Sequence, residues 1–507
     1  MSLSQKAVIS SLFTYVQFGL ALLSGVVLFP LIVTSVGSYS YGLWLATGEA
    51  ISYVLLGDLG VFTVLPWLIA ASAGASDFDN LRQHLSNAFV IGCALGLLLL
   101  LAAGVLIYTT RTTLSPNISQ INEVVASVAL LLLLNGLCYP FRVANAYLTG
   151  VQDIYFTGGL AVCLNVMTIV LTVAMVLGGT GIFGLAIATG LPPLIGGAAS
   201  AIRMWFRHSI IFHDVRRPTY GGCCKLFREG FAGWLGGLGF RLMTASNGIV
   251  FSLTGHPEWG TVFASTNKIA QILSPLCSTM PDSGLIGLGH VYAAGDHVRT
   301  HRSVVCLLLL YLVLPSFAAI GLLILNSVFV DWWIGPELFA GSYVNTLMAA
   351  NLVASVVAGG CLKLVCVVGN RHVVGCTTLI AGIVYAVLGF CMVRVREIAG
   401  LAETSLIVSL LVVLPVGGQL ITRVFGVRYR ELSQYGMGRW LAISIPMLIA
   451  ACVIGVYVRG SMAIAITVSV VVICLYGFLL RSVLSEVPWP IRVRFWLARL
   501  SIIPKVA

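Results

Sequence analysis

Long apolar stretches constrain this chain more than any other feature of its sequence. A helix needs about 20 apolar residues to cross the hydrocarbon core of a membrane. The alternating pattern of barrel strands is not seen, so the backbone has to satisfy its polar groups within helices. We identify fourteen such stretches, at 8–36, 42–70, 85–108, 122–148, 154–178, 181–204, 229–253, 259–292, 303–330, 343–367, 372–393, 401–422, 439–458 and 460–480. The sequence therefore predicts an all-α polytopic membrane protein.

The composition excludes the soluble classes of protein. Only 9% of the 507 residues are charged and 59% are hydrophobic, whereas a soluble domain carries roughly a quarter of charged residues. We therefore expect no soluble enzyme, no disordered protein and no nucleic-acid partner, in spite of the net charge of +11. The 13 cysteines form no CxxC pair, so we expect neither a metal nor another cofactor.

The basic residues predict how the chain is oriented. With the N-terminus in the cytoplasm, 22 of the 28 Lys and Arg residues fall on the cytoplasmic side and four on the far side. Two more, Arg241 and Lys268, lie inside stretches. Cytoplasmic loops of membrane proteins carry such an excess of Lys and Arg. We therefore expect a multi-pass membrane protein with both termini in the cytoplasm.

Two loops match each other and indicate an internal duplication. Asp79, Arg82, His84 and Ser86 have counterparts 217 residues further on, in Asp296, Arg299, His301 and Ser303. Two parallel six-helix repeats with a cavity between them are a frequent design of transporters. We predict a six-helix bundle over 1–206, a basic linker over 207–228, a second bundle over 229–425, two extra helices over 426–481 and a basic amphipathic cytoplasmic tail over 482–507.

The second stretch carries a motif that resembles a known family. Gly37 precedes Tyr41-Gly42-Leu-Trp44, and Gly57-Asp58-Leu-Gly60 follows. This pattern resembles the start of bacterial polysaccharide flippases of the Wzx type, in the multidrug/oligosaccharidyl-lipid/polysaccharide exporter (MOP) superfamily. The resemblance implies a flippase, not an enzyme. It would move undecaprenyl-pyrophosphate-linked oligosaccharide across the inner membrane by alternating access, for O-antigen, capsule or exopolysaccharide assembly.

Charged residues inside the stretches are candidate functional residues, because ionisable groups are costly in hydrocarbon. The resemblance implies a substrate pyrophosphate, which cations bind well. Arg241 and Lys268 lie deep in their stretches, while Arg142 and Lys363 lie nearer the cytoplasmic ends. Sugar hydroxyls would be bound by amide side chains, and the candidates are Asn135, Asn145, Asn247 and Gln271. Asp58 and Asp282 are candidate ion-coupling residues.

Structural roles for the same charges stay open at this point. Asp58 can pair with Arg241, and Asp282 can cap a broken helix. Arg142 and Lys363 can extend to the cytoplasmic interface. Either reading is compatible with the spacing of these residues in the sequence.

Two rival functions also stay open. One is a cation-coupled multidrug exporter of the same superfamily, although the first stretch has Gln17 where such exporters often have an acidic residue. The other is a membrane-embedded polysaccharide polymerase or ligase, which needs larger far-side loops than this chain has. For a flippase, the expected partners are the lipid-linked oligosaccharide and membrane lipids, together with a polysaccharide polymerase and a chain-length regulator.

Overall fold

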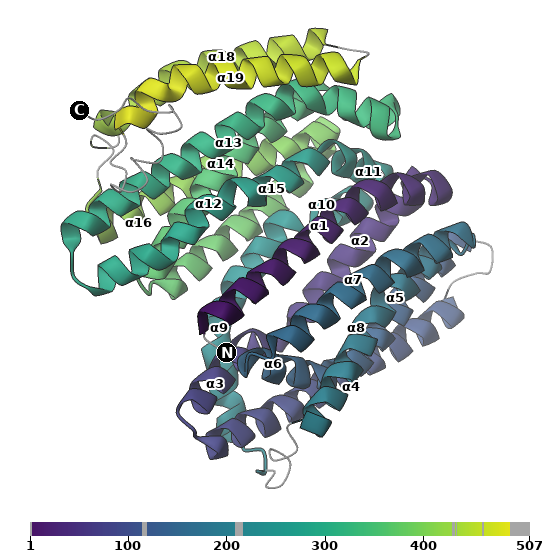
Figure 1. The fold of residues 1–507 in the computed structure, drawn as a ribbon. Helices are drawn as coiled ribbons and strands as arrows, with labels where there is room; N and C mark the ends of the chain where they lie inside the picture. Colours follow the sequence, from purple (N-terminus) through teal and green to yellow (C-terminus); the bar gives the residue numbers. More distant parts are fainter. Residues whose placement is uncertain are drawn as a thin grey trace. The chain divides into compact units, whose positions relative to one another are not determined.

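The described part of the chain is helical throughout (Figure 1). The computed structural model describes residues 3–113, 119–207, 216–427, 431, 433–458 and 461–486. The predicted tail over 482–507 lies almost wholly outside these ranges, and so does the middle of the predicted linker. The prediction of an all-α polytopic membrane protein is confirmed.

The chain divides into two compact units, Met1–Gly260 and Thr261–Ala507. We call them the N-unit and the C-unit. The six-helix bundles that the sequence repeat predicts remain a prediction. The two matching segments, predicted as loops, lie at the starts of the helices that begin at Phe78 and His297. Each has an ion pair between its Asp and the Arg three residues later, at 4.0 Å for Asp79–Arg82 and 3.2 Å for Asp296–Arg299.

The N-unit consists of long helices and several short ones. In Figure 1, α1 runs beside α7, in agreement with their contacts. Helix α9 packs against α3 and α4, and α10 packs against α2. The elements are α1 (Leu3–Val36), α2 (Ser38–Val54), η1 (Leu55–Asp58), α3 (Val61–Gly74), α4 (Phe78–Thr113), α5 (Ser119–Cys138), η2 (Tyr139–Phe141), α6 (Arg142–Gly150), α7 (Ile154–Leu177), α8 (Gly181–Arg207), α9 (Tyr220–Thr244) and α10 (Asn247–Leu253).

The C-unit is built around α13, which contacts α12, α14, α18 and α19. The last two helices run alongside α13 at one edge of Figure 1. Helix α11 (Pro257–Thr266) contains the boundary between the two units. The elements that follow are α12 (Lys268–Ala293), α13 (His297–Ile334), η4 (Pro336–Leu338), α14 (Ser342–Val367), α15 (Arg371–Ile407), η5 (Val408–Val413), α16 (Leu414–Phe425), η6 (Ser433–Met437), α18 (Gly438–Tyr457) and α19 (Met462–Glu486).

All fourteen predicted stretches fall on these helices. By length and composition, ten of the described helices can cross a membrane, and eleven if the bent pair Ser38–Asp58 and Val61–Gly74 is one span. The single helical segment over 371–425 covers two predicted stretches. They are separated by a kink at Glu397, where φ is 52°. The stretches 229–253 and 259–292 are interrupted, between α9 and α10 and between α11 and α12.

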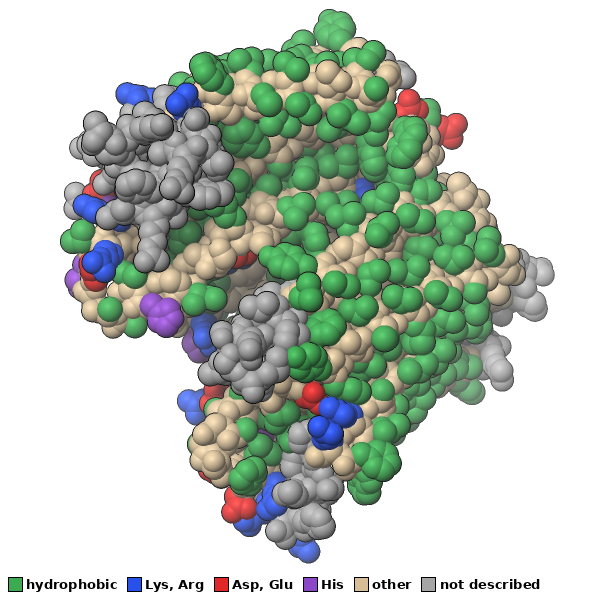
Figure 2. Space-filling model, in the orientation of Figure 1, with side chains coloured by type: hydrophobic (Ala, Val, Ile, Leu, Met, Phe, Trp, Pro, Cys, Tyr) green, Lys and Arg blue, Asp and Glu red, His purple; other side chains and the backbone are tan. Residues whose placement is uncertain are grey.

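The helix flanks expose apolar side chains, as contact with lipid requires. On α4, for example, the exposed side chains include Leu97, Leu98, Leu101 and Val105. On the face seen in Figure 2, hydrophobic side chains cover most of the helix surface and charged ones are few. Apolar patches of this extent mark a membrane-facing surface rather than a water-facing one.

Close backbone contact between α2 and the start of α11 depends on Gly42. A Cβ atom on residue 42 would overlap the backbone carbonyl of Pro257. Gly48 lies on the same helix, and a Cβ atom there would meet nothing within 4 Å. The two glycines therefore form a matched pair, because only one of them is needed for packing.

We expect Gly42→Ala to lower the melting temperature of the purified protein in detergent. The backbone has to move apart, and overpacking of this kind costs about 1–3 kcal/mol. Gly48→Ala should leave the melting temperature unchanged or raise it, because alanine is the better helix former by about 1 kcal/mol. Equal melting temperatures for the two variants would contradict the packing described here.

Candidate functional site

An ion pair lies inside the N-unit, between Asp58 and Arg142. Asp58 ends the turn η1, where the second predicted span bends, and its side chain is buried. Its Oδ1 accepts a hydrogen bond from the backbone N–H of Gly60 at 3.0 Å. Its Oδ2 lies 3.5 Å from Nη1 of Arg142, the first residue of α6. Because a buried carboxylate without a cation is strongly destabilising, this contact holds the bend and α6 together.

Aromatic rings fix the Arg142 guanidinium in place. Its carbon lies 5.1 Å from the centroid of the Phe62 ring and 4.9 Å from that of Tyr139. Both distances are within the range of cation–π attraction. The Tyr139 hydroxyl donates a 2.9 Å hydrogen bond to the carbonyl of Leu55, which opens η1. The acid, the cation and the bend in the second span therefore form one connected group.

The C-unit holds a second ion pair, between Asp282 on α12 and Lys363 on α14. Lys363 Nζ donates to both carboxylate oxygens of Asp282, at 2.7 and 3.0 Å. The Tyr311 hydroxyl, on α13, donates to Asp282 Oδ1 at 2.5 Å. This pair is more exposed than the first, since the side chains of Lys363 and Asp282 are 44% and 36% exposed.

The two ion pairs occupy matching places in the predicted six-span repeats. In each, the acid comes from the second span of the repeat and the cation from the fourth. The structure thus brings together two predicted ion-coupling residues with two predicted substrate-binding residues. It does not pair Asp58 with Arg241, and Asp282 is a partner of Lys363 rather than a helix cap.

Glu49 contacts the break in the seventh predicted span. The sequence predicted neither the break nor this role of Glu49. Its Oε2 accepts a 2.9 Å hydrogen bond from the backbone N–H of Ile249, in the first turn of α10. One turn further along α2, the Tyr53 hydroxyl donates to the carbonyl of Arg241 at 3.1 Å and contacts the Ser246 hydroxyl at 2.6 Å. Helix N-termini attract carboxylates because their first N–H groups lack partners. The signal in the sequence that could have revealed this role is that Glu49 is an acidic residue inside an apolar stretch.

The other predicted substrate-binding residues do not converge on one place. Arg241 is exposed near the end of α9, rather than in the middle of an unbroken span. Lys268 is the first residue of α12 and is half-buried, while Gln271 is exposed one turn later. Asn247 is the first residue of α10, and the side chain of Asn135 donates to the carbonyl of Leu131 in its own helix. Their binding roles stay predictions.

A cavity of about 230 Å³ lies within the N-unit, and we call it the N-unit cavity. Residues of α5, η2, α6, α7 and α8 line it. Two predicted substrate-binding residues, Arg142 and Asn145, are among them. The lining also includes Ser200, which nothing in the sequence pattern singled out.

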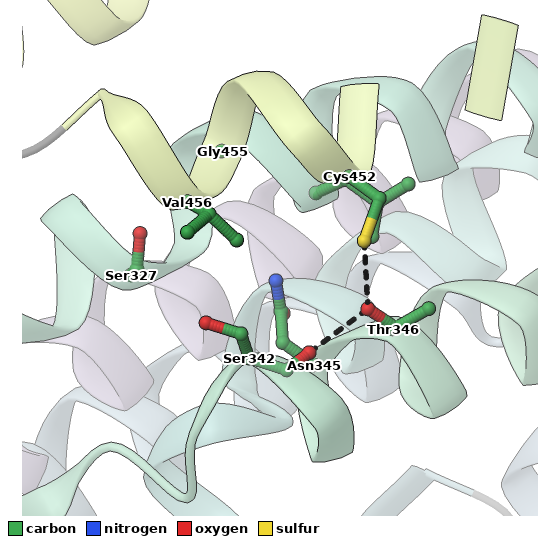
Figure 3. A pocket seen from close by; sticks show the side chains of 8 residues that line it. Ser327, Ser342, Asn345, Thr346, Cys452, Gly455 and Val456 are labelled. Carbon is green, nitrogen blue, oxygen red and sulfur yellow. Dashed lines mark hydrogen bonds between the residues drawn. The ribbon is translucent and has the colours of Figure 1, made fainter. Parts of the chain in front are cut away.

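A much smaller pocket lies in the C-unit, where α18 meets α13 and α14 (Figure 3). Its volume is about 10 Å³, which is close to the space that one water molecule needs. The Thr346 hydroxyl lies 3.3 Å from Cys452 Sγ of α18 and donates to the carbonyl of Ser342. This pocket is a packing detail of α18 rather than a site for a substrate.

No group of three or more His, Cys, Asp or Glu side chains that could hold a metal ion occurs in the described ranges.

Comparison with known proteins gives the fold. No protein-family model and no curated protein matches the chain. An inward-facing multidrug resistance MATE family transporter of the MOP superfamily matches with a TM-score of 0.62 at 14% identity, over 78% of this chain and 94% of its own. The chain has a MATE-like fold. A multidrug resistance MATE family transporter of the MOP superfamily in an outward-facing conformation also matches this chain. Its TM-score is 0.58 at 16% identity, over 83% of this chain and 96% of its own.

A third structure with the MATE-like fold differs in its pocket. It is a MOP superfamily transporter from Pyrococcus furiosus, for which a reversed polarity of the binding pocket is described as suggesting a different function. It matches with a TM-score of 0.56 at 14% identity, over 83% of this chain and 97% of its own. At such identities the likeness concerns the fold.

We expect Arg142→Ala to destabilise the protein more than Lys363→Ala. The first change leaves Asp58 buried without its cation, which costs about 3–5 kcal/mol. The second costs less, because Asp282 is partly exposed and keeps the hydrogen bond from Tyr311. The measurement is thermal unfolding of the purified variants in detergent.

A double variant serves as the control for this comparison. Arg142→Ala combined with Asp58→Asn removes the buried charge together with its cation, so part of the lost stability should return. Equal losses for the two single variants, or no recovery in the double variant, would count against a buried ion pair.

Proposed function

We propose that this chain is a multi-pass membrane transporter that works by alternating access, with both termini in the cytoplasm of a bacterial cell. The observation that carries the proposal is the MATE-like fold over 78% to 83% of the chain. Transporters of this fold have been seen facing inward and facing outward. The division of this chain into two compact units, each with an intramembrane ion pair, suits such a cycle.

The comparisons back multidrug export better than the movement of a lipid-linked oligosaccharide. Two of the matching structures are described as multidrug resistance transporters. A multidrug exporter driven by a cation gradient is therefore the first candidate. Asp58 and Asp282 are then the acids through which the driving ion would act.

The charge of the intramembrane side chains is the observation that favours the second candidate, a flippase for undecaprenyl-pyrophosphate-linked oligosaccharide. Asp58 and Asp282 are each neutralised by a cation of their own unit. Arg241 and Lys268 add two positive charges and Glu49 one negative charge, so cations remain in surplus among these side chains. Surplus cations attract a pyrophosphate and repel cationic drugs. The Pyrococcus furiosus protein is a precedent for a different pocket polarity on this fold.

Transport in proteoliposomes separates the two candidates. The first predicts uptake of a cationic dye that depends on an ion gradient. The second predicts that a fluorescent undecaprenyl-pyrophosphate oligosaccharide in the outer leaflet becomes protected from an external quencher. Vesicles with heat-denatured protein are the control. If the native protein moves neither substrate, the proposed function is wrong for both classes.

Under the flippase candidate, Arg241→Ala and Lys268→Ala should each stop transport of the lipid-linked oligosaccharide while the protein still inserts into the membrane. Each change removes a cation that would replace water around the pyrophosphate. Arg299→Ala, at an exposed position in the first turn of α13, is the matched control and should transport normally. Normal transport by both Arg241→Ala and Lys268→Ala would refute the assignment of these two residues.

A further inference from the structure

The two halves of the interrupted seventh predicted span are attached to α2 by different side chains. Before the interruption, the Tyr53 hydroxyl donates to the carbonyl of Arg241 near the end of α9 and contacts the Ser246 hydroxyl. After the interruption, the Glu49 carboxylate accepts a hydrogen bond from the backbone N–H of Ile249 in α10. The charge of Glu49 therefore affects how α10 is held, whereas the Tyr53 attachment of α9 does not use a carboxylate.

Glu49 differs from the other two acids that lie well inside the predicted spans. Asp58 and Asp282 each have a cation within ion-pair distance. Of the Lys and Arg side chains that the structure describes, none forms an ion pair with Glu49. A buried charge without a cation is costly, and a carboxyl group avoids this cost by binding a proton. Protonation of Asp58 or Asp282 would instead leave a cation unpaired.

Few charged groups face Glu49 from the elements that pack against α2, which are α1, α5, α8, α9, α10 and η1. Tyr53, one turn further along α2, and Arg241 of α9 are the titratable and charged groups beside the attachment. Helix α10 has no titratable residue. Three charged side chains of η1, α5 and α8 have partners of their own, and they are Asp58, Glu123 and Arg203. The remaining charged residues of these helices lie at the start of α1 or α9 or at the end of α8, and they are Lys6, Lys225, Arg228, Glu229 and Arg207.

Loss of the Glu49 charge would weaken one contact between α2 and α10 without disturbing their packing. Hydrogen bonds to an ionised group are roughly twice as strong as those to a neutral one. The close approach of the two helices depends on Gly248, where a Cβ atom would lie 2.8 Å from the backbone nitrogen of Ala46. This approach brings Ile249 within reach of Glu49. With Glu49 neutral, α10 is held less firmly on α2, while the Tyr53 attachment remains.

We propose that Glu49 is a proton-binding carboxyl group within the membrane and that its protonation loosens α10 from α2. The proton comes from water and ends on a carboxylate oxygen of Glu49. Its release to water restores the strong hydrogen bond from Ile249. This inference deepens the exporter candidate and rests on it for a role in transport. Where the driving ion is a proton, Glu49 binds it, while Asp58 and Asp282 keep their ion pairs.

Infrared difference spectroscopy of the full-length protein in lipid vesicles tests proton binding. On acidification, we expect a C=O band of a protonated carboxyl group, which ¹³C labelling of glutamate should shift because Asp58 and Asp282 do not contribute to it. Glu49→Gln should remove this band. Glu123→Gln is the matched control and should keep it. Glu123 also accepts a backbone N–H, from Ile182, but it lies at the edge of its predicted span.

Hydrogen exchange at α10 tests the loosening. Wild type and Glu49→Gln are compared at the same pH, so the direct effect of pH on exchange cancels. Above the pH range in which the infrared band appears, the peptide that contains Ile249 should exchange about fivefold faster in Glu49→Gln, because a neutral amide accepts a weaker hydrogen bond. Below that range the difference should vanish, since Glu49 is then neutral in the wild type too. Glu123→Gln should exchange like the wild type in α10.

Three results would overturn this role of Glu49. They are an infrared band that glutamate labelling does not shift, an unchanged band in Glu49→Gln, and equal exchange of α10 in wild type and Glu49→Gln at every pH. The labelling uses the wild-type protein, so it can refute the proposal even if Glu49→Gln does not fold.

Transport is measured separately in proteoliposomes. Uptake of a cationic dye that a proton gradient drives equally well in wild type and Glu49→Gln would overturn the role of Glu49 alone. Absence of any transport, with the infrared band and the exchange of α10 as expected, would overturn the proposed function alone.

Discussion

The cost of placing charge inside an apolar helical bundle is the constraint on which this structure depends. Asp58 is buried in the N-unit and is tolerable there only because Arg142 lies beside it and Gly60 donates to it. Meeting that requirement fixes the bend of the second predicted span against the start of α6. The rings of Phe62 and Tyr139 then hold the guanidinium, and Tyr139 returns a hydrogen bond to the same bend.

The C-unit meets the same constraint with different chemistry. Asp282 is paired with a lysine instead of an arginine, and a tyrosine hydroxyl donates directly to the carboxylate. A lysine is a point charge without the planar fork of arginine, so the pair needs no aromatic stack and tolerates partial exposure. The two pairs share their places in the predicted repeats, although their surroundings have diverged. Each unit thus carries its own link between an acid and a cation, which come from the second and fourth spans of the corresponding predicted repeat.

Hydropathy was sufficient to predict the helices, because the backbone N–H and C=O groups of long apolar stretches in a membrane have to be satisfied within helices. The rule that ionisable residues inside spans are candidates for function also selected both ion pairs. This rule could not predict which cation pairs with which acid. Asp58 and Arg142 are brought together by the fold, and the sequence allowed a pair of Asp58 with Arg241 equally well. Breaks such as the one before α10 were missed, since apolar character continues through them.

Spin-label distances test most directly whether the two units move relative to each other during transport. Labels at Ala75 and Ala294, which are exposed at the ends of matching helices in the N-unit and the C-unit, can be introduced into a variant without reactive cysteines. In proteoliposomes, we expect two distance populations whose ratio changes when a transported substrate is added. A single distance that no substrate or ion gradient alters would contradict it.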